Sequence, residues 1–254
     1  MKLRHQWIAA ALCLICFGLI VSPQPTLAAV YTVSSAEDLV AAITSANSNP
    51  NADTILIAAN ITLTAASESN VDYGDTGLPG ITSDITIEGQ GYSIKRDTAV
   101  NTPDFRIFRV AAGAHLTLYN VTISGGRATV CTVCLGERWG SGLFSEGIIT
   151  MYHTVVTANM DERGAGMFVK GGTANIYDST FSDNSSGAGA GIYVSTTANI
   201  NIVDSLFTGN SATFTFGNGG LSLCKLMGWQ RLIAAPLAVT QLSKVVASCL
   251  RAVI

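Results

Sequence analysis

Two aspartates stand at matched positions in consecutive repeats of this sequence. Asp178 and Asp204 lie one repeat apart, and a strand-like pattern is expected to direct both carboxylates outward. An aligned pair could bind a cation, and calcium is an ion that carboxylate oxygens bind well. Two acids at one strand spacing otherwise repel each other, so the alternative is a solvated acidic strip. We therefore expect no metal site and no cofactor, with calcium as the alternative.

A second cluster of charged residues follows Asn159 in the sequence. Asp161, Glu162 and Arg163 are expected in a loop between strands, and Glu137 lies in a preceding excursion of the chain. Carboxylates beside an arginine could cleave a glycan by acid–base hydrolysis or by calcium-assisted proton abstraction from a uronate. We expect no catalytic site from these residues, because the outward positions that match between repeats are mixed in type: Asn120, His153, Asp178 and Asp204.

Tyrosines supply the candidate binding residues. Tyr152 and Tyr177 occupy matched positions 25 residues apart, which predicts that their rings lie side by side on an outer surface. Such a surface can bind sugar rings, although aromatic ladders also simply stabilise sheets. Three other tyrosines are candidates for the same outward set: Tyr92, Tyr119 and Tyr193.

The motif Cys131-x-x-Cys134 falls in a segment that interrupts the repeat. In an exported protein a disulfide clip on this loop is expected, with free thiols as the alternative. A zinc site would need two further Cys or His ligands. A thioredoxin-like redox role would need a βαβ setting, which the pattern does not provide.

These candidates are positioned by a repeat. Three segments share one pattern, namely ITMYHTVVTAN (149–159), ANIYDSTFSDN (174–184) and INIVDSLFTGN (200–210), and LTLYNVTISGG (116–126) fits the same frame. Apolar and polar residues alternate within each copy, which indicates strands with one buried face. Strands this short cannot bury a core alone, so the units must stack in parallel. The sequence predicts an all-β fold, a right-handed parallel β-helix with coils of about 25 residues.

Stacking would align matched residues into ladders. The expected internal ladders are Met151, Ile176 and Ile202, and Val156, Phe181 and Phe207. An Asn ladder is expected at one corner, where Asn tolerates left-handed backbone and its amide can bond the coil above: Asn159, Asn184 and Asn210. Glycines are expected at a second corner, where a side chain would clash: Gly164, Gly166, Gly189 and Gly191.

The N-terminus predicts export. Lys2 and Arg4 precede an apolar run over 7–21, and small residues follow, so residues 1–29 are expected to be a signal peptide. The run is shorter than the roughly 20 residues that span a bilayer, which favours cleavage over a retained anchor. Residues 30–220 are then the β-helix. A short amphipathic helix near 35–47, with Ser35 as N-cap, is expected to cover its first coil, 54–64.

Residues 221–254 depart from the repeat, with no Gly corner, no Asn corner and no acid. One interpretation is a helical C-terminal cap. The other is a frameshift at Leu221, because codons read one base over can spell the further coil ATFNSSTISGNTAEQGGG. The chain would then be a fragment of a longer protein and prone to aggregation. Under either interpretation no role is assigned to Cys224, Trp229 or Cys249.

Charge argues against nucleic acid as a partner. The chain has a formal net charge of −3, but residues 30–220 hold 8 basic and all 17 acidic residues, a net charge of −9. A body this acidic repels phosphate backbones.

Two resemblances emerge from these segments. The run YTVSSAEDLVAAITSANSNPNADTILIAANITLT, with ITSDITIEG and RIFRVAAGAHLTLYNVTISGG, resembles secreted bacterial β-helix proteins of the pectin-lyase-like superfamily. The later coils resemble polymorphic outer membrane protein repeats, in which a Phe-x-x-Asn corner is combined with a Gly-Gly-Ala-Ile-like corner. Phe181 with Asn184 and Phe207 with Asn210 match the first corner, and the segments that contain Gly166 and Gly191 match the second only approximately.

The resemblance implies a secreted or cell-surface scaffold or adhesin, associated with the outer membrane and directed toward carbohydrate or other cell-surface material. No transmembrane anchor is expected in the mature chain. The alternative is a polysaccharide lyase or glycoside hydrolase of the same fold. A third possibility is a passenger domain that has lost a C-terminal anchor.

Overall fold

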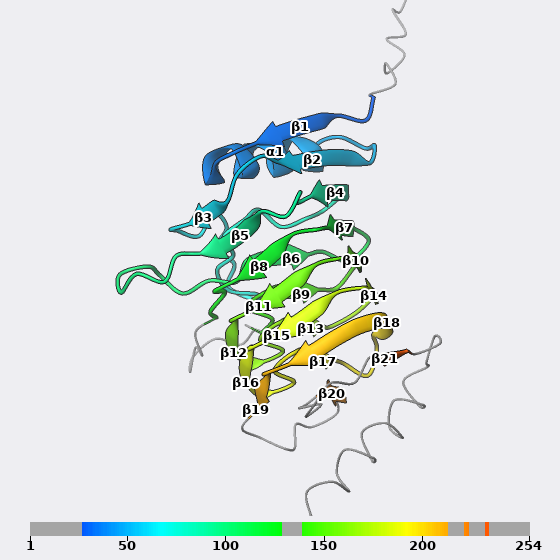
Figure 1. Cartoon of the computed structure of the whole chain (residues 1–254). Helices are drawn as coiled ribbons and strands as arrows, with labels where there is room; N and C mark the ends of the chain where they lie inside the picture. Colours follow the sequence, from blue (N-terminus) through cyan, green and yellow to red (C-terminus); the bar gives the residue numbers. More distant parts are fainter. Residues whose placement is uncertain (1–26, 129–138, 213–220, 224–231, 234–254) are drawn as a thin grey trace, which may run out of the picture.

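The computed structural model describes residues 27–128, 139–212, 221–223 and 232–233. The described chain winds into stacked coils whose strands pair in parallel with their copies in the next coil (Figure 1). The predicted parallel β-helix is therefore confirmed. Most of the predicted signal peptide (1–29), the residues Cys131, Cys134 and Glu137, and most of the tail over 221–254 lie outside the described residues, and those predictions stay open.

Three parallel sheets form the walls of the solenoid. The long sheet contains β1 (Val30–Val33), β2 (Asp53–Ile57), β4 (Asp84–Glu88), β7 (His115–Tyr119), β10 (Ile148–Tyr152), β14 (Thr173–Tyr177) and the first half of β18 (Asn199–Thr208). The second sheet contains β3 (Ile61–Leu63), β5 (Ser93–Arg96), β8 (Thr122–Ser124), β11 (Val155–Thr157), β15 (Thr180–Ser182) and the second half of β18. The third sheet contains β6 (Phe108–Val110), β9 (Leu143–Ser145), β13 (Met167–Val169), β17 (Ile192–Val194) and β20 (Leu221–Leu223).

A short corner sheet and two antiparallel strands complete the described part. The corner sheet joins β12 (Met160–Arg163), β16 (Ser185–Ala188) and β19 (Ser211–Ala212). Strand β20 pairs antiparallel with β17, and β21 (Leu232–Ile233) pairs antiparallel with β18. The parallel repeat thus gives way to reversed strands at the last described coil.

The register of the sheets aligns identical positions of successive coils. Met151 is paired with Ile176 and Ile176 with Ile202, and Leu118 extends this buried ladder by one coil. The rings of Phe181 and Phe207 stack with centroids 5.1 Å apart. Because each coil repeats the inward residues of the last, one continuous apolar core runs the length of the solenoid.

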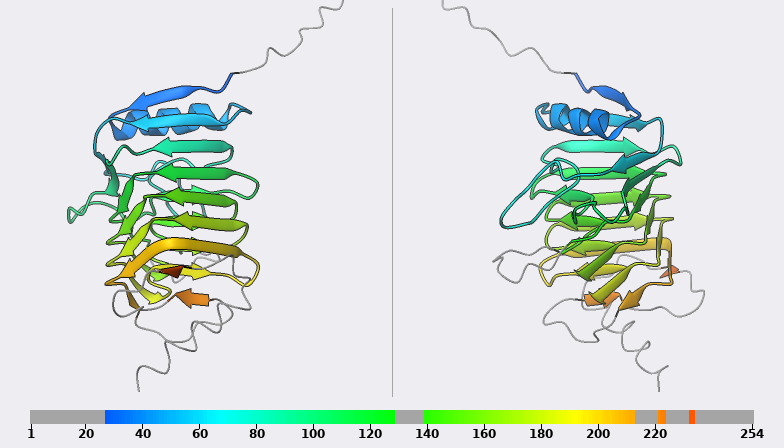
Figure 2. Two further views of the ribbon diagram at one scale, coloured as in Figure 1. Left: turned by 45° about the vertical axis from the view of Figure 1, so that its right-hand side comes forward. Right: turned by 90° about the vertical axis from the view of Figure 1, so that its left-hand side faces the viewer.

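Helix α1 (Ala36–Asn47) covers the N-terminal end of the solenoid, where the sequence predicts it (Figure 2). The Ser35 side chain caps it by accepting a hydrogen bond from the Asp38 amide at 3.1 Å. Its buried face carries four residues at helical spacing: Leu39, Ala42, Ile43 and Ala46. Strand β1, which the sequence analysis did not predict, pairs with β2 beside this helix. In the described part of the chain, no helix is long and apolar enough to cross a membrane.

The left-handed backbone lies at other positions than predicted. Positive φ is found one residue before each ladder asparagine, at Ala158, Asp183 and Gly209, and not at the asparagines. The asparagine side chain instead spans the gap between coils while its own backbone stays in ordinary conformation. A second left-handed column follows the long sheet, with φ between 45° and 49°: Asn120, His153, Asp178 and Asp204.

Candidate binding surface

The outer face of the long sheet carries a row of three stacked tyrosines, here called the tyrosine row: Tyr119, Tyr152 and Tyr177. The sheet register pairs them directly, one per coil. The ring centroids of Tyr119 and Tyr152 lie 4.7 Å apart with planes at 8°, and those of Tyr152 and Tyr177 lie 5.1 Å apart with planes at 13°. All three side chains are half-buried. The sequence predicted the last two at matched positions and named Tyr119 as a further candidate for the same set.

The other predicted aromatics do not join the row. Tyr92 packs against the core at the start of β5, and Tyr193 is buried in the third sheet. Their spacing from the neighbouring tyrosines is not that of one coil in the same strand. The prediction of a single set of five outward tyrosines is therefore wrong.

Stacking determines which part of each ring can meet a ligand. The ring faces inside the row cover one another, so ring edges and phenol hydroxyls point toward solvent. The Tyr177 hydroxyl accepts a hydrogen bond from Asn201 Nδ2 at 3.3 Å. The hydroxyls of Tyr119 and Tyr152 have no hydrogen-bond partner among the described residues. Burial, followed by the two neighbouring phenols, raises the pKa of Tyr152, which keeps its hydroxyl a donor.

A polar column runs beside the tyrosine row. It consists of the residues two positions earlier in each strand: Thr117, Thr150, Asn175 and Asn201. The His115 ring lies 2.9 Å from the Thr150 hydroxyl and 3.3 Å from that of Thr117, so these groups are oriented by one another. The tyrosine row and this column together present hydroxyls and amides in parallel lines across the coils.

Asp178 lies in the turn that directly follows β14, and Asp204 lies at the matched position inside β18, where that strand passes from the long sheet to the second sheet. Both have positive φ, a conformation that Asp and Asn tolerate better than most residues. The mixed series that begins with Asn120 and His153 is thus explained by the turn, which needs a residue of this kind in each coil. The described residues contain no group of three or more His, Cys, Asp or Glu placed to hold a metal ion.

Asp161, Glu162 and Arg163 form strand β12, so the prediction of a loop is wrong. The Asp161 carboxylate accepts a hydrogen bond from the Glu162 amide at 2.6 Å. Burial raises the pKa of Asp161 well above its usual range, while backbone amides and the Arg106 guanidinium oppose that rise. The Arg163 guanidinium lies 4.3 Å from the ring centroid of Trp139. The structure places these residues on the corner sheet, on a different wall from Asp178 and Asp204.

A second aromatic stack, the covered cluster, lies on the outer side of the third sheet. Phe144 and Phe168 stack with centroids 5.6 Å apart, and Phe168 and Tyr193 with centroids 5.4 Å apart. Tyr73 and Trp139 pack over this stack, which is buried. The sequence analysis missed it, although GLFS, GMFV and GIYV each place an aromatic two residues after a glycine.

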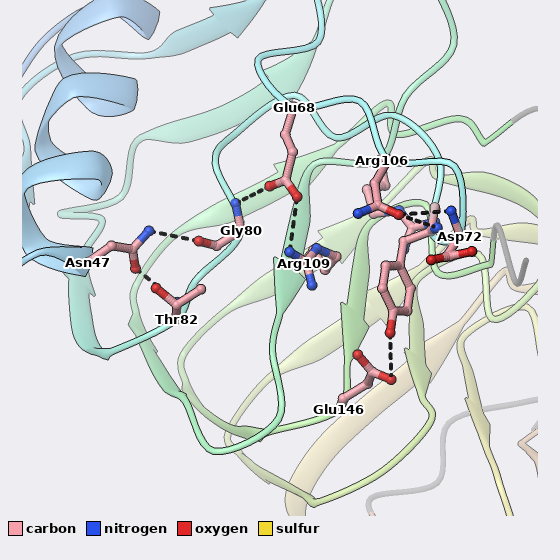
Figure 3. Close-up of polar contacts among 10 residues, drawn as sticks. Asn47, Glu68, Asp72, Gly80, Thr82, Arg106, Arg109 and Glu146 are labelled. Atoms are coloured by element: carbon pink, nitrogen blue, oxygen red, sulfur yellow. Dashed lines mark hydrogen bonds and ion pairs between the residues drawn. The ribbon is translucent and has the colours of Figure 1, made fainter.

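The loop over residues 64–83 holds Tyr73 in place. Glu68 accepts hydrogen bonds from the Gly80 amide at 2.6 Å and from Arg109 at 3.0 Å, and Figure 3 shows its carboxylate between the two. The Tyr73 hydroxyl donates to Glu146 at 3.4 Å, and Arg106 donates to the Tyr73 carbonyl. The covered cluster is therefore closed by the protein itself, and the tyrosine row is the aromatic surface that faces outward.

Comparison with known proteins agrees with this architecture. Residues 30–141 match the family model described as "Putative pectate lyase-like adhesive domain". The match runs from β1 almost to β9 and includes Tyr119 of the row. No curated protein matches the chain. The resemblance of the later coils to polymorphic outer membrane protein repeats stays a prediction. The family match over 30–141 and the parallel coils together agree with a pectin-lyase-like β-helix, and the matched segment is similar to a domain described as adhesive.

Proposed function

We propose that this chain is an exported adhesive protein that binds carbohydrate on the cell surface or in its surroundings through the tyrosine row. The single observation that carries the proposal is the row itself, in which half-buried phenols recur in every coil from β7 to β14. Phenols and amides are suited to bind sugars, because they offer apolar edges beside hydrogen-bond donors. The family match to an adhesive domain supports the same function.

The alternative is a polysaccharide lyase or hydrolase. It would need two carboxyl groups, or a carboxyl group and a base, on the same substrate. Asp178 and Asp204 have a structural reason to be acidic or amidic in the turn, and the carboxylate of Asp161 is engaged by backbone amides. These observations favour binding over cleavage.

Binding to immobilised polysaccharides tests the proposal. We expect the wild-type chain to be retarded in native gels that contain a recognised polysaccharide, and Tyr152→Ala to lose most of that retardation. Tyr152→Phe keeps the stack and removes one donor, so a partial loss is expected. Tyr92→Phe makes the same chemical change at a half-buried tyrosine outside the row and serves as the matched control.

Two outcomes would contradict the proposal. One is equal retardation of wild type and Tyr152→Ala when both give the same circular dichroism spectrum. The other is release of unsaturated or reducing ends from the polysaccharide, which would identify an enzyme instead. Localisation of the mature protein outside the cell, by fractionation, tests the predicted export.

A further inference from the structure

The charge of the surface around the tyrosine row restricts what can bind there. The five strands that form this face, β4, β7, β10, β14 and β18, contain no lysine or arginine. Asp84 and Glu88 of β4 stand at one end of the face, Asp178 directly follows β14, and Asp204 lies within β18. A polyanion placed on this face would meet the like charges of Asp84, Glu88 and Asp178, and the strands of the face carry no lysine or arginine to attract it.

Six of the seven basic residues of the described coils have acidic or aromatic partners away from this face, and the seventh, Lys95, is exposed on β5 of the second sheet. Ion pairs hold four of the six: Arg96 and Arg127 with Asp104, Arg109 with Glu68, and Lys170 with Glu146. Arg106 and Arg163 lie over aromatic rings of the covered cluster. None of these six lies on a strand of the long sheet.

The spacing of the row restricts the shape of the ligand. Neighbouring ring centroids of the tyrosine row lie 4.7 Å and 5.1 Å apart, which is roughly the length of one sugar ring in an extended polysaccharide. The row crosses the strands, so a chain that follows it runs along the solenoid axis. Because ring faces within the row are covered, each tyrosine contributes an edge and a hydroxyl to its sugar, and Asn201 orients the Tyr177 hydroxyl by donating a hydrogen bond to it.

We infer that the ligand of the tyrosine row is an uncharged polysaccharide whose chain lies along the solenoid axis with one sugar per coil. This inference rests on the proposed function and specifies its ligand. A polyuronate is the ligand class that the family description suggests. It is disfavoured here because the face carries acidic residues and its strands contain no lysine or arginine.

Affinity electrophoresis of the full chain with two sets of polymers tests the inference. The uncharged set is β-1,3-glucan, xyloglucan, mannan and hydroxyethylcellulose, and the anionic set is polygalacturonate and alginate. We expect retardation by at least one uncharged polymer, unchanged at high salt and with a calcium chelator, and none by the anionic set. With oligosaccharides of the recognised polymer, affinity should rise by about tenfold or more from the disaccharide to the tetrasaccharide and then level off. The rise is expected because each added sugar contacts a further tyrosine, and the plateau because the row then ends.

A charge-reversal variant tests whether this face can be made to bind an anionic polysaccharide. Asp84→Lys combined with Glu88→Lys places two cations on the face, and we expect it to bind polygalacturonate in a salt-sensitive manner. Asp72→Lys makes a comparable change at an exposed position of the 64–83 loop and should gain no such binding. A double variant that gains nothing overturns the assignment of the ligand to this face.

The outcomes separate this inference from the proposed function. Polyuronate binding by wild type that is lost in Tyr152→Ala would overturn the inference and leave the adhesive function intact. Polyuronate binding that requires calcium and is lost in Asp178→Asn would also overturn it, since the acids would then be the ligand site. Binding to no polysaccharide of either set would overturn the proposed function itself.

Discussion

The ladder asparagines Asn159 and Asn184 each bond the coils on both sides of them. Asn184 Oδ1 accepts hydrogen bonds from the Asn159 amide at 3.1 Å and from Asn159 Nδ2 at 3.0 Å. Its own Nδ2 donates to the Val156 carbonyl at 2.9 Å and to Asn210 Oδ1 at 2.9 Å. These groups are buried, so water cannot replace a lost partner.

Asn184→Ala is therefore expected to destabilise the protein strongly. Each buried polar group left unpaired costs about 1–3 kcal/mol, and the change leaves several. The free energy of unfolding, measured in urea by circular dichroism, should fall accordingly. Asp183→Gly alters the exposed residue before Asn184 and introduces the glycine that the next coil has at the matched position, Gly209. We expect it to change the free energy of unfolding by no more than about 0.5 kcal/mol. Similar losses in both variants would show that the amide ladder contributes little.

The raised pKa of Tyr152 predicts an alkaline sensitivity. The folded state favours the protonated phenol, so this contribution to stability is complete below the ordinary tyrosine pKa of about 10 and is lost as the pH rises through the raised value. Thermal unfolding of the wild type should shift downward above that pH more than unfolding of Tyr152→Phe. An ultraviolet titration of the phenolates should show one late-titrating group fewer in the variant. Identical alkaline profiles would refute this.

Residue types that looked chemical in the sequence turned out to have conformational causes. The series Asn120, His153, Asp178 and Asp204 suggested a partial acidic strip, but what its members share is a left-handed turn. The sequence shows that a position repeats and shows its residue type. It does not show its φ, and Asp, Asn and His are used both for ligands and for such turns.

At the scale of elements, the glycine corner sets how closely the coils approach. A Cβ on Gly166 would lie 2.4 Å from the Gly191 carbonyl oxygen of the next coil, and backbone cannot move aside. A Cβ on Gly171 would find its nearest neighbour, the Glu146 carbonyl oxygen, at 3.4 Å. Both glycines have backbone angles that other residues adopt, so they differ in available space alone.

Gly166→Ala should therefore cost about 1–3 kcal/mol or more, the usual range for overpacking. Gly171→Ala should be neutral or stabilise by up to about 1 kcal/mol, because alanine reduces the entropy of the unfolded chain. Urea unfolding of the two variants side by side measures the difference. Equal stability would mean that the coils can separate at this corner without cost.

The parts of the fold that follow the repeat could be predicted from the sequence, and the parts that do not follow it could not. Strands in successive coils repeat a pattern, so Met151, Ile176 and Ile202 could be aligned by counting. The loop over 64–83 repeats nothing. Its contacts, such as Glu68 with Arg109, join residues 41 positions apart, and no local pattern reports them. The covering of Phe144 by Tyr73 depends on that loop and could not be foreseen.

At the scale of the whole molecule, α1 protects the first coil from solvent and from other chains. Leu39 and Ile43 are fully buried against the end of the solenoid, where the apolar core would otherwise be exposed and promote association. The helix and its N-cap were predictable, because the residue types at a helix start and the spacing of its apolar face are local properties.

Ile43→Asp should detach this helix and produce a β-rich protein that self-associates, because a buried charge without a partner is costly. Sedimentation velocity should then show larger species whose proportion grows with concentration. Ala41→Asp introduces the same side chain on the exposed side of α1 and should stay in the state of the wild type. A monomeric Ile43→Asp variant would show that the cap is dispensable for solubility.

The 25-residue interval between Asn159 and Asn184 makes the length of this solenoid a stepwise quantity. Between these two coils every ladder recurs at this interval, so a duplicated copy of residues 160–184 would enter between existing coils with its inward residues, its corner glycines and its amide already in register. Each such step would lengthen the molecule by one strand spacing of about 4.8 Å and bring one more tyrosine with it. The length of the surface that this fold displays can therefore change only by whole coils.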